Sequence, residues 1–143
     1  MERSKNCKRC GTCCCDFPIF EHEAKRIQEY IEKRPDLLKK LYRGFDVNGC
    51  IFLLPGENGT WNCSIYDSGV RPLVCKVFGT KGLSELKCPE NCFVGTKYTR
   101  KQAMDLLRKN EQKSRPIGMM NSVMLPFVAR SLKKHLMEEI FSK

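Results

Sequence analysis

The sequence predicts a mainly α-helical fold with one small β-hairpin, in which a cysteine-rich domain is followed by a helical tail. Apolar residues recur at helical spacing in several segments, and two strand-like runs flank a loop rich in Gly, Pro and Asn. All ten cysteines lie between Cys7 and Cys92. We therefore predict a cysteine-rich domain over residues 1–95 and a basic helical C-terminal segment over residues 96–143 that packs on it.

The first predicted helix follows the N-terminal cysteine run. Apolar residues recur at helical spacing from Phe20 to Ile31, and acidic residues in the first turn suit the helix dipole. Pro35 ends this helix, and residues 36–42 have the pattern of a second short one.

The predicted hairpin lies in the middle of the chain. Residues 50–54 and 61–66 are strand-like, and the loop of residues 55–59 between them contains Pro, Gly and Asn. Because side chains alternate along a strand, Cys50 and Cys63 are expected to point toward the same side of the hairpin.

Three further helices are expected after the hairpin. Pro72 suits the first position of a short helix that ends near Gly79. Thr99 and Gln102 have the form of a capping box at the start of the next helix. A final helix is expected to begin near Pro126, and its inward stripe is predicted to consist of Ala129, Leu132, Leu136 and Ile140.

The composition limits the class of protein. Hydrophobic residues make up 41% of the 143 residues and charged residues 29%, as in soluble globular proteins. No apolar run is long enough to span a bilayer, and the first residues lack the apolar segment of a secretory signal. We therefore expect a cytoplasmic protein, in which cysteines more often bind metal or perform redox chemistry than form disulfides.

The densest chemistry lies between Cys7 and Cys15, where five cysteines occur within nine residues. Cys-x-x-Cys spacing lets two thiolates turn back onto one metal, and it recurs in zinc and iron–sulfur proteins. Lys8 and Arg9 favour the thiolate form by raising the local positive potential. The alternative, that these cysteines are small hydrophobic core residues, fits poorly with such charged neighbours.

The number of cysteines indicates two sites rather than one. Neighbouring side chains diverge in an irregular backbone, so Cys13, Cys14 and Cys15 are not expected to bind one ion together. Tetrahedral zinc and a cubane iron–sulfur cluster each take four ligands. Ten cysteines suffice for two four-thiolate sites with two to spare. The remote cysteines that complete such sites are Cys50, Cys63, Cys75, Cys88 and Cys92.

The ordered motifs resemble the YkgJ-type cysteine-cluster family, which is also described as a zinc- or iron-chelating domain. The resemblance covers residues 5–92 and rests on Cys7-x-x-Cys10-Gly11-x-Cys13-Cys14, Asn48-Gly49-Cys50-Ile51-Phe52-Leu53, Cys63-Ser64-Ile65-Tyr66 and Arg71-Pro72-x-x-Cys75-Lys76-x-Phe78. The resemblance implies that the metal ligands are Cys7, Cys10, Cys13, Cys14, Cys50, Cys63, Cys75 and Cys88. Cys15 and Cys92 lie outside the usual ligand set of that family.

Iron, including iron–sulfur, is favoured over zinc, and both remain candidates. The N-terminal Cys-x-x-Cys-x-x-Cys run resembles the clustered part of a ferredoxin ligand run, whose remote cysteine precedes proline as Cys88 does. Zinc sites tolerate the same spacings. An all-thiolate ligand set argues against magnesium, calcium and a mononuclear oxygenase iron.

Other polar residues give weaker indications. Tyr66 and Arg71 are candidate cofactor-binding residues that could donate hydrogen bonds to cluster sulfurs or to a substrate. The alternative for Arg71 is a structural pairing with a carboxylate or a backbone carbonyl. We interpret His22 and His135 as ordinary surface residues, because the thiols already supply enough ligands.

The sequence therefore predicts a metal-binding protein with a scaffold, metal-delivery or interaction role. The alternative is an iron–sulfur redox or maturation enzyme, or an electron-transfer subunit of a larger complex. Residues 93–143 carry 11 basic and 4 acidic residues, so this tail is a candidate surface for a protein partner. Nucleic acid is not expected, because no nucleic-acid-binding motif or aromatic platform accompanies these charges.

Overall fold

A computed structural model describes residues 16–44, 49–59, 61–77 and 99–142 of the chain. The predicted mainly helical fold with a small β-hairpin is confirmed over these residues. The helices in chain order are α1 (Glu21–Glu32), α2 (Pro35–Gly44), α3 (Leu73–Val77), α4 (Arg100–Glu111) and α5 (Met120–Phe141). The strands are β1 (Pro18–Phe20), β2 (Leu53–Pro55), β3 (Trp61–Cys63) and β4 (Pro116–Met119), with a 3-10 turn η1 (Glu57–Gly59) between β2 and β3.

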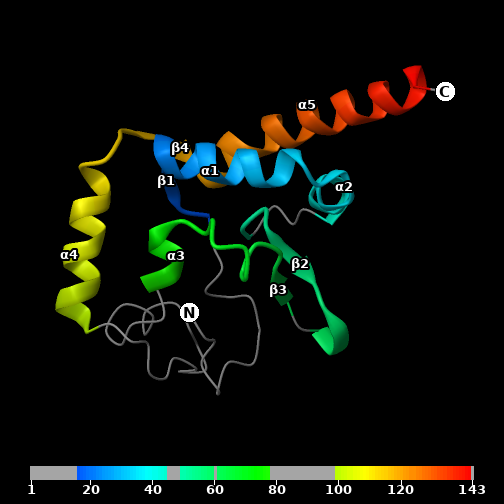
Figure 1. Ribbon diagram of the computed structural model, residues 1–143. Coiled ribbons are helices and arrows are strands. Elements are labelled where there is room, and N and C mark those ends of the chain that lie inside the picture. The colour runs from blue at the N-terminus through cyan, green and yellow to red at the C-terminus, as the bar shows by residue number, and fades with distance from the viewer. Residues whose placement is uncertain (1–15, 45–48, 60, 78–98, 143) are drawn as a thin grey trace.

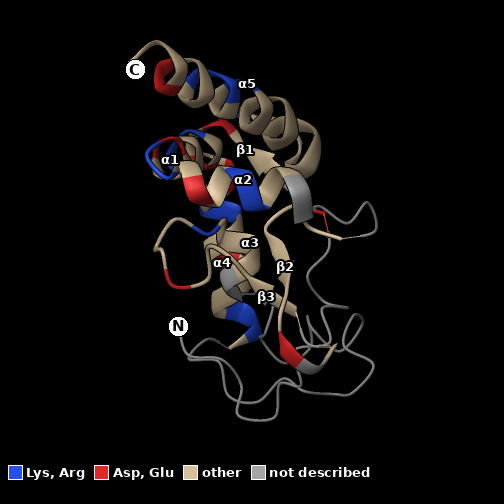
Figure 2. Cartoon of the chain, turned by 90° about the vertical axis from the view of Figure 1, so that its right-hand side faces the viewer, with Lys and Arg blue, Asp and Glu red and all other residues tan. Residues whose placement is uncertain are grey.

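The elements are arranged in layers around α1 and α2. Helix α5 runs along one side of these two helices, and the β2–β3 hairpin and α3 lie on the other side (Figures 1 and 2). Helix α4 contacts α3 and stands apart from α5 (Figure 1). Helices α1 and α2 therefore both pack against α5.

Helix α1 forms at the predicted place because its apolar residues follow the helical repeat. Ala24, Ile27 and Ile31 are all buried. The helix ends at Glu32, and Pro35 begins α2, where its missing N–H and fixed φ are tolerated.

The chain forms two small antiparallel sheets. Strands β2 and β3 form the predicted hairpin, but it is shorter than predicted: Leu53 pairs with Cys63 and Pro55 with Trp61. The second sheet joins β1 to β4 and was not predicted from the sequence. It connects the segment that follows the cysteine run to the segment that precedes α5, which lies about a hundred residues later in the chain.

The prediction for the final helix is wrong in its start and in its buried face. Helix α5 begins at Met120, so Pro126 lies inside the helix rather than at its first position. The buried side chains are Met120, Met124, Val128 and Ser131, whereas Leu136 and Ile140 are exposed. Apolar residues occur on every side of this helix, so the sequence contained more than one plausible stripe.

One hydrophobic core includes residues from both predicted domains. Ile19, the buried faces of α1 and α2, Phe52, Ile65 and the N-terminal half of α5 belong to a single cluster. The domain boundary predicted at residue 95 falls within residues 78–98, outside the described residues. Among the helices that the structure describes, none combines the length and the apolar character needed to cross a membrane.

Candidate metal centre

Three of the eight predicted ligands belong to the described residues. Cys50 lies in the turn before β2, Cys63 is the last residue of β3, and Cys75 lies within α3. None of the three forms a disulfide. The other predicted ligands, Cys7, Cys10, Cys13, Cys14 and Cys88, lie outside the described residues, as do Cys15 and Cys92.

The thiol of Cys50 is held in the core. Only 7% of Cys50 is exposed, and its neighbours Ile51 and Phe52 are fully buried. The carbonyl of Cys50 accepts a hydrogen bond from the backbone N–H of Leu53 at 2.9 Å, which closes a tight turn into β2. The turn and the buried residues after it determine where this thiol lies.

Burial raises the pKa of the Cys50 thiol well above its ordinary value. A backbone hydrogen bond from Phe52 lowers the pKa, and negative charge on Cys75, Cys63 and Asp16 raises it further. Cys75, Cys63 and Asp16 therefore each lie within electrostatic range of Cys50, although they come from separate parts of the chain. A bound cation at this place would reverse the preference for the protonated thiol.

The hairpin fixes Cys63 relative to Cys50. Cys63 pairs with Leu53 across the ladder, and the N–H of Ser64 donates to the carbonyl of Phe52 at 2.7 Å. The carbonyl of Cys63 accepts a hydrogen bond from Tyr66 N–H at 3.2 Å. The hairpin predicted from sequence thus brings the segments of two candidate ligands together.

Arg71 holds the segment that carries Cys75. Its Nη2 atom donates to the carbonyl of Cys75 at 2.7 Å, and its guanidinium carbon lies 4.3 Å from the centre of the Tyr66 ring. Arg71 is only 7% exposed, so this contact is shielded from solvent. Gly69, at φ +79°, allows the tight loop that brings Arg71 back over Tyr66. These contacts agree with the structural alternative predicted for Arg71, in which its guanidinium pairs with a backbone carbonyl.

Glu23 is a second support for Cys75 and was missed from the sequence. Its Oε2 atom accepts a hydrogen bond from the N–H of Leu73, the first residue of α3, at 2.7 Å. Its Oε1 atom accepts from the N–H of Phe20 at 3.3 Å. Glu23 is only 5% exposed. A carboxylate adjacent to the apolar stripe of α1 was the signal that could have identified it.

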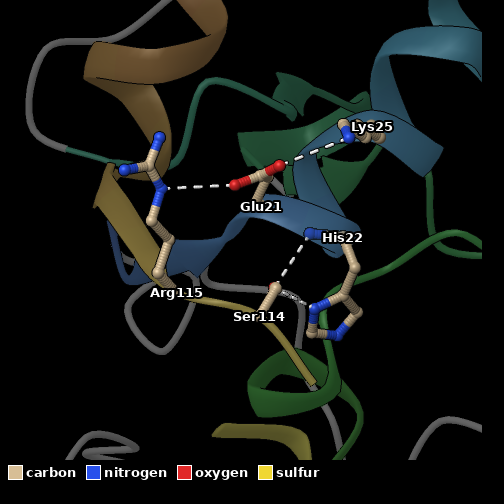
Figure 3. A network of polar contacts seen from close by, with 5 residues as sticks. All are labelled: Glu21, His22, Lys25, Ser114 and Arg115. Atoms are coloured by element: carbon tan, nitrogen blue, oxygen red, sulfur yellow. Dashed lines mark hydrogen bonds and ion pairs between the residues drawn. The ribbon is translucent and has the colours of Figure 1, made fainter. Parts of the chain in front are cut away.

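The histidines lie in hydrogen-bonded positions. His22 is half-buried, and its ring contacts Ser114 and Asn110 (Figure 3 shows Ser114), so its interpretation as an ordinary surface residue is wrong. The backbone N–H of His22 also donates to Oγ of Ser114 at 3.1 Å. His135 Nε2 lies 2.6 Å from the carbonyl of Glu32 at the end of α1. Both histidines connect helices to neighbouring segments.

The described part of the chain supplies only a portion of a ligand set. Within it, no three His, Cys, Asp or Glu side chains are grouped closely enough to hold a metal ion. Cys63 and Cys75 nevertheless both act electrostatically on Cys50, and the donor atoms of all three residues are sulfur. Thiolate donors suit zinc, iron and iron–sulfur clusters, so the chemistry of these three residues fits the predicted metals.

Asp16 marks where the N-terminal cysteine run enters the described structure. It directly follows Cys15, and its negative charge acts on Cys50. Its Oδ1 atom accepts a hydrogen bond from the backbone N–H of Asn121 in α5 at 2.9 Å. Asp16, the first described residue, is thereby attached to the start of α5.

Comparison with known families agrees with this donor set. Residues 6–113 match the CxxCxxCC family model, which is described as "Putative zinc- or iron-chelating domain". Comparisons with curated proteins and with solved structures gave no match. The matched residues contain all ten cysteines and make up most of the chain. The protein belongs to the CxxCxxCC family of zinc- or iron-chelating domains.

Proposed function

We propose that this protein holds metal through two four-thiolate sites, with iron or iron–sulfur favoured over zinc. The eight proposed ligands are Cys7, Cys10, Cys13, Cys14, Cys50, Cys63, Cys75 and Cys88. The family supports metal chelation in general, and the number of sites, the grouping of ligands and the choice of metal are our proposal.

The observation that carries the proposal is the environment of Cys50. Cys50 is buried in the core, and the hairpin that carries Cys63 is hydrogen-bonded to the turn that contains Cys50, so an uncompensated thiolate would be unfavourable there. A metal cation bound by these thiolates would supply the missing positive charge, and binding would release the thiol protons.

The proposed role is that of a scaffold, a metal-delivery protein or an interaction module. Arg71 and Glu23 support this role, because their hydrogen bonds fix the helix that carries Cys75. We keep the cofactor-binding role predicted for Tyr66 and Arg71 as a second proposal for these side chains, since a guanidinium stacked on a ring can also donate to sulfur. A reversible change of visible absorbance on reduction would favour the alternative, an iron–sulfur redox or maturation enzyme or an electron-transfer subunit.

Individual cysteine substitutions test the ligand assignment. Cys50→Ala, Cys63→Ala and Cys75→Ala should each lower the metal content per chain, measured by elemental analysis after anaerobic purification. Cys15→Ala and Cys92→Ala are the matched controls, and each should retain the wild-type metal content. Wild-type metal content in Cys50→Ala, with circular dichroism unchanged, would overturn the proposed ligand set.

We also propose a cytoplasmic protein whose tail contacts a protein partner. Four apolar side chains near the end of α5 are exposed: Leu136, Met137, Ile140 and Phe141. This end of the helix extends beyond α2 (Figure 1), and the helix carries both basic and acidic residues (Figure 2). Exposed apolar residues gathered at one place favour an interaction surface.

Replacing two of these residues tests the tail contact. Ile140→Ser combined with Phe141→Ser should leave metal content unchanged, because neither residue contributes to the core. We expect native mass spectrometry of the wild-type protein, isolated from its own cells, to show a complex heavier than the single chain. The double variant isolated in the same way should lack this complex. An identical distribution of masses for the two proteins would contradict the role of this end of α5.

A further inference from the structure

The side chain of Asn121 bridges the two backbone groups on either side of Cys50. Its Nδ2 atom donates a hydrogen bond to the carbonyl of Gly49, and its Oδ1 atom accepts one from the N–H of Ile51, both at 2.7 Å. The donor and the acceptor of the carboxamide are thus both used. Rotating the amide by half a turn would oppose donor to donor and acceptor to acceptor, so its orientation is determined by these partners.

Asn121 is half-buried and held in place at the start of α5. It is the second residue of α5, and the residue before it, Met120, is buried. The backbone N–H of Asn121 donates to the carboxylate of Asp16, which directly follows the N-terminal cysteine run. One residue of α5 therefore connects the end of that run to the segment that contains Cys50.

The bridge gives a hydrogen-bond acceptor to the backbone N–H of Ile51, which has little access to solvent. Ile51 is fully buried, and a buried N–H without a partner would be strongly unfavourable. The carbonyl of Cys50 is already used by Leu53 N–H. The two peptide groups that flank Cys50 are therefore held by specific hydrogen bonds, which fix the backbone from which its thiol extends.

We propose that Asn121 is a positioning residue of the metal centre, which orients the Cys50 thiolate by clamping the backbone on both sides of it. This inference rests on the proposed function of Cys50 as a ligand. Asn121 lies beyond residues 6–113, the part of the chain that matches the family, so the family match gives it no role. Helix α5 is thereby part of the support of the metal centre.

The proposal requires a reduced metal affinity when the clamp is removed. Ligand atoms must lie within a few tenths of an ångström of their ideal distance from the metal. Loss of residues that orient ligands typically weakens metal binding about 10- to 100-fold. Co²⁺ is a suitable probe, because thiolate ligation gives it visible absorption that depends on the geometry of the ligands.

The matched control is Val128→Ala on the same helix. Val128 is fully buried, so this variant loses stability through a cavity, but it makes none of the hydrogen bonds around Cys50. Asn121→Ala should lower the Co²⁺ affinity about 10- to 100-fold and alter the visible spectrum. Val128→Ala should unfold more easily yet keep the wild-type affinity and spectrum.

Asn121→Asp provides a second test if the alanine variant does not fold. Aspartate keeps an acceptor for Ile51 N–H and is well tolerated in the first turn of a helix, but it cannot donate to Gly49. It should therefore fold and bind Co²⁺ more weakly than the wild-type protein. Wild-type Co²⁺ affinity and spectrum in Asn121→Asp, or equal behaviour of Asn121→Ala and Val128→Ala, would overturn the positioning role while leaving the proposed function intact. A metal-free wild-type protein that takes up neither Co²⁺ nor iron and sulfide would instead overturn the four-thiolate proposal and the role of Asn121 with it.

Discussion

The Nε2 atom of His22 lies 2.7 Å from the Oδ1 atom of Asn110, across 88 residues of sequence. An amide oxygen only accepts, so Nε2 carries the proton in this hydrogen bond. Asn110 is only 6% exposed and lies near the end of α4, whereas His22 lies in the first turn of α1. The ring also contacts Ser114 Oγ (Figure 3). The hydrogen bond between His22 and Asn110 holds α4 against the start of α1.

Replacing His22 should destabilise the protein. In His22→Ala the buried oxygen of Asn110 loses its donor, and leaving such a group unsatisfied costs about 1–3 kcal/mol. The free energy of unfolding from denaturant titration measures the change. His135→Ala is the control, because its ring contact with the Glu32 carbonyl is exposed and that carbonyl can bind water instead. Equal losses for the two variants would show that the His22 contact contributes no more than a surface hydrogen bond.

Replacing Glu23 should weaken the connection between α1 and α3. In Glu23→Gln one carboxylate oxygen becomes an N–H donor, so either Leu73 N–H or Phe20 N–H loses its acceptor. We expect a loss of about 1–3 kcal/mol in the free energy of unfolding. Hydrogen exchange at the Leu73 amide or at the Phe20 amide should accelerate in the same variant. Glu29→Gln, at an exposed position of the same helix, should change neither the stability nor these exchange rates, and unchanged exchange at both amides in Glu23→Gln would refute the bridging role of Glu23.

Glu21 is expected to titrate below its ordinary range. Its pKa is lowered from 4.5, first by the hydrogen bond and charge of Lys25 and then by those of Arg115 (Figure 3). Because the folded-state pKa is the lower one, this carboxylate stabilises the fold above its unfolded-state pKa. That contribution disappears as the pH falls through the lowered folded-state pKa.

An NMR titration of the Glu21 carboxyl carbon tests the direction of this shift. Lys25→Gln and Arg115→Gln should each raise the pKa of Glu21 toward 4.5, and the change should be larger for Lys25. Lys39→Gln, an exposed change on α2, should leave it unchanged. The effect on stability should be small at moderate salt, since Lys25 and Arg115 are both well exposed. A Glu21 midpoint at or above 4.5 in the wild-type protein would contradict the ion pairs.

The local signals in the sequence predicted much of the fold. The helical repeat from Ala24 to Ile31 predicted α1 and its buried face. The capping box of Thr99 and Gln102 is present with both of its hydrogen bonds, 2.9 Å and 3.1 Å long. These features depend on residues only a few positions apart, which is why pattern reasoning succeeds with them.

The features that were missed depend on distant parts of the chain. Strand β1 has three residues and forms only because β4 lies beside it, and no local pattern encodes that pairing. Helix α5 has apolar residues on all sides, so only its packing against α1 and α2 selects the buried face. His22 and Asn121 owe their roles to partners from other elements.

The sequence predicted the chemical type of the candidate site, a set of thiol ligands, but not the contacts that hold these ligands in place. The spacing of the cysteines indicated metal binding, and the resemblance to the cysteine-cluster family supplied the predicted ligands by residue. The buried turn that contains Cys50 and the Glu23 and Arg71 contacts around Cys75 come from tertiary structure. Sequence spacing alone carries no information about such supporting hydrogen bonds.

Metal and acid-labile sulfide analysis after anaerobic purification tests the central claim, that the cysteines hold metal in two thiolate sites. We predict two occupied sites per chain, with iron, acid-labile sulfide and broad visible absorbance. Two zinc ions in a colourless protein would support the sites and overturn the preference for iron. A folded protein that stays metal-free after incubation with iron, sulfide and zinc, and whose ten cysteines all react as thiols, would contradict the claim.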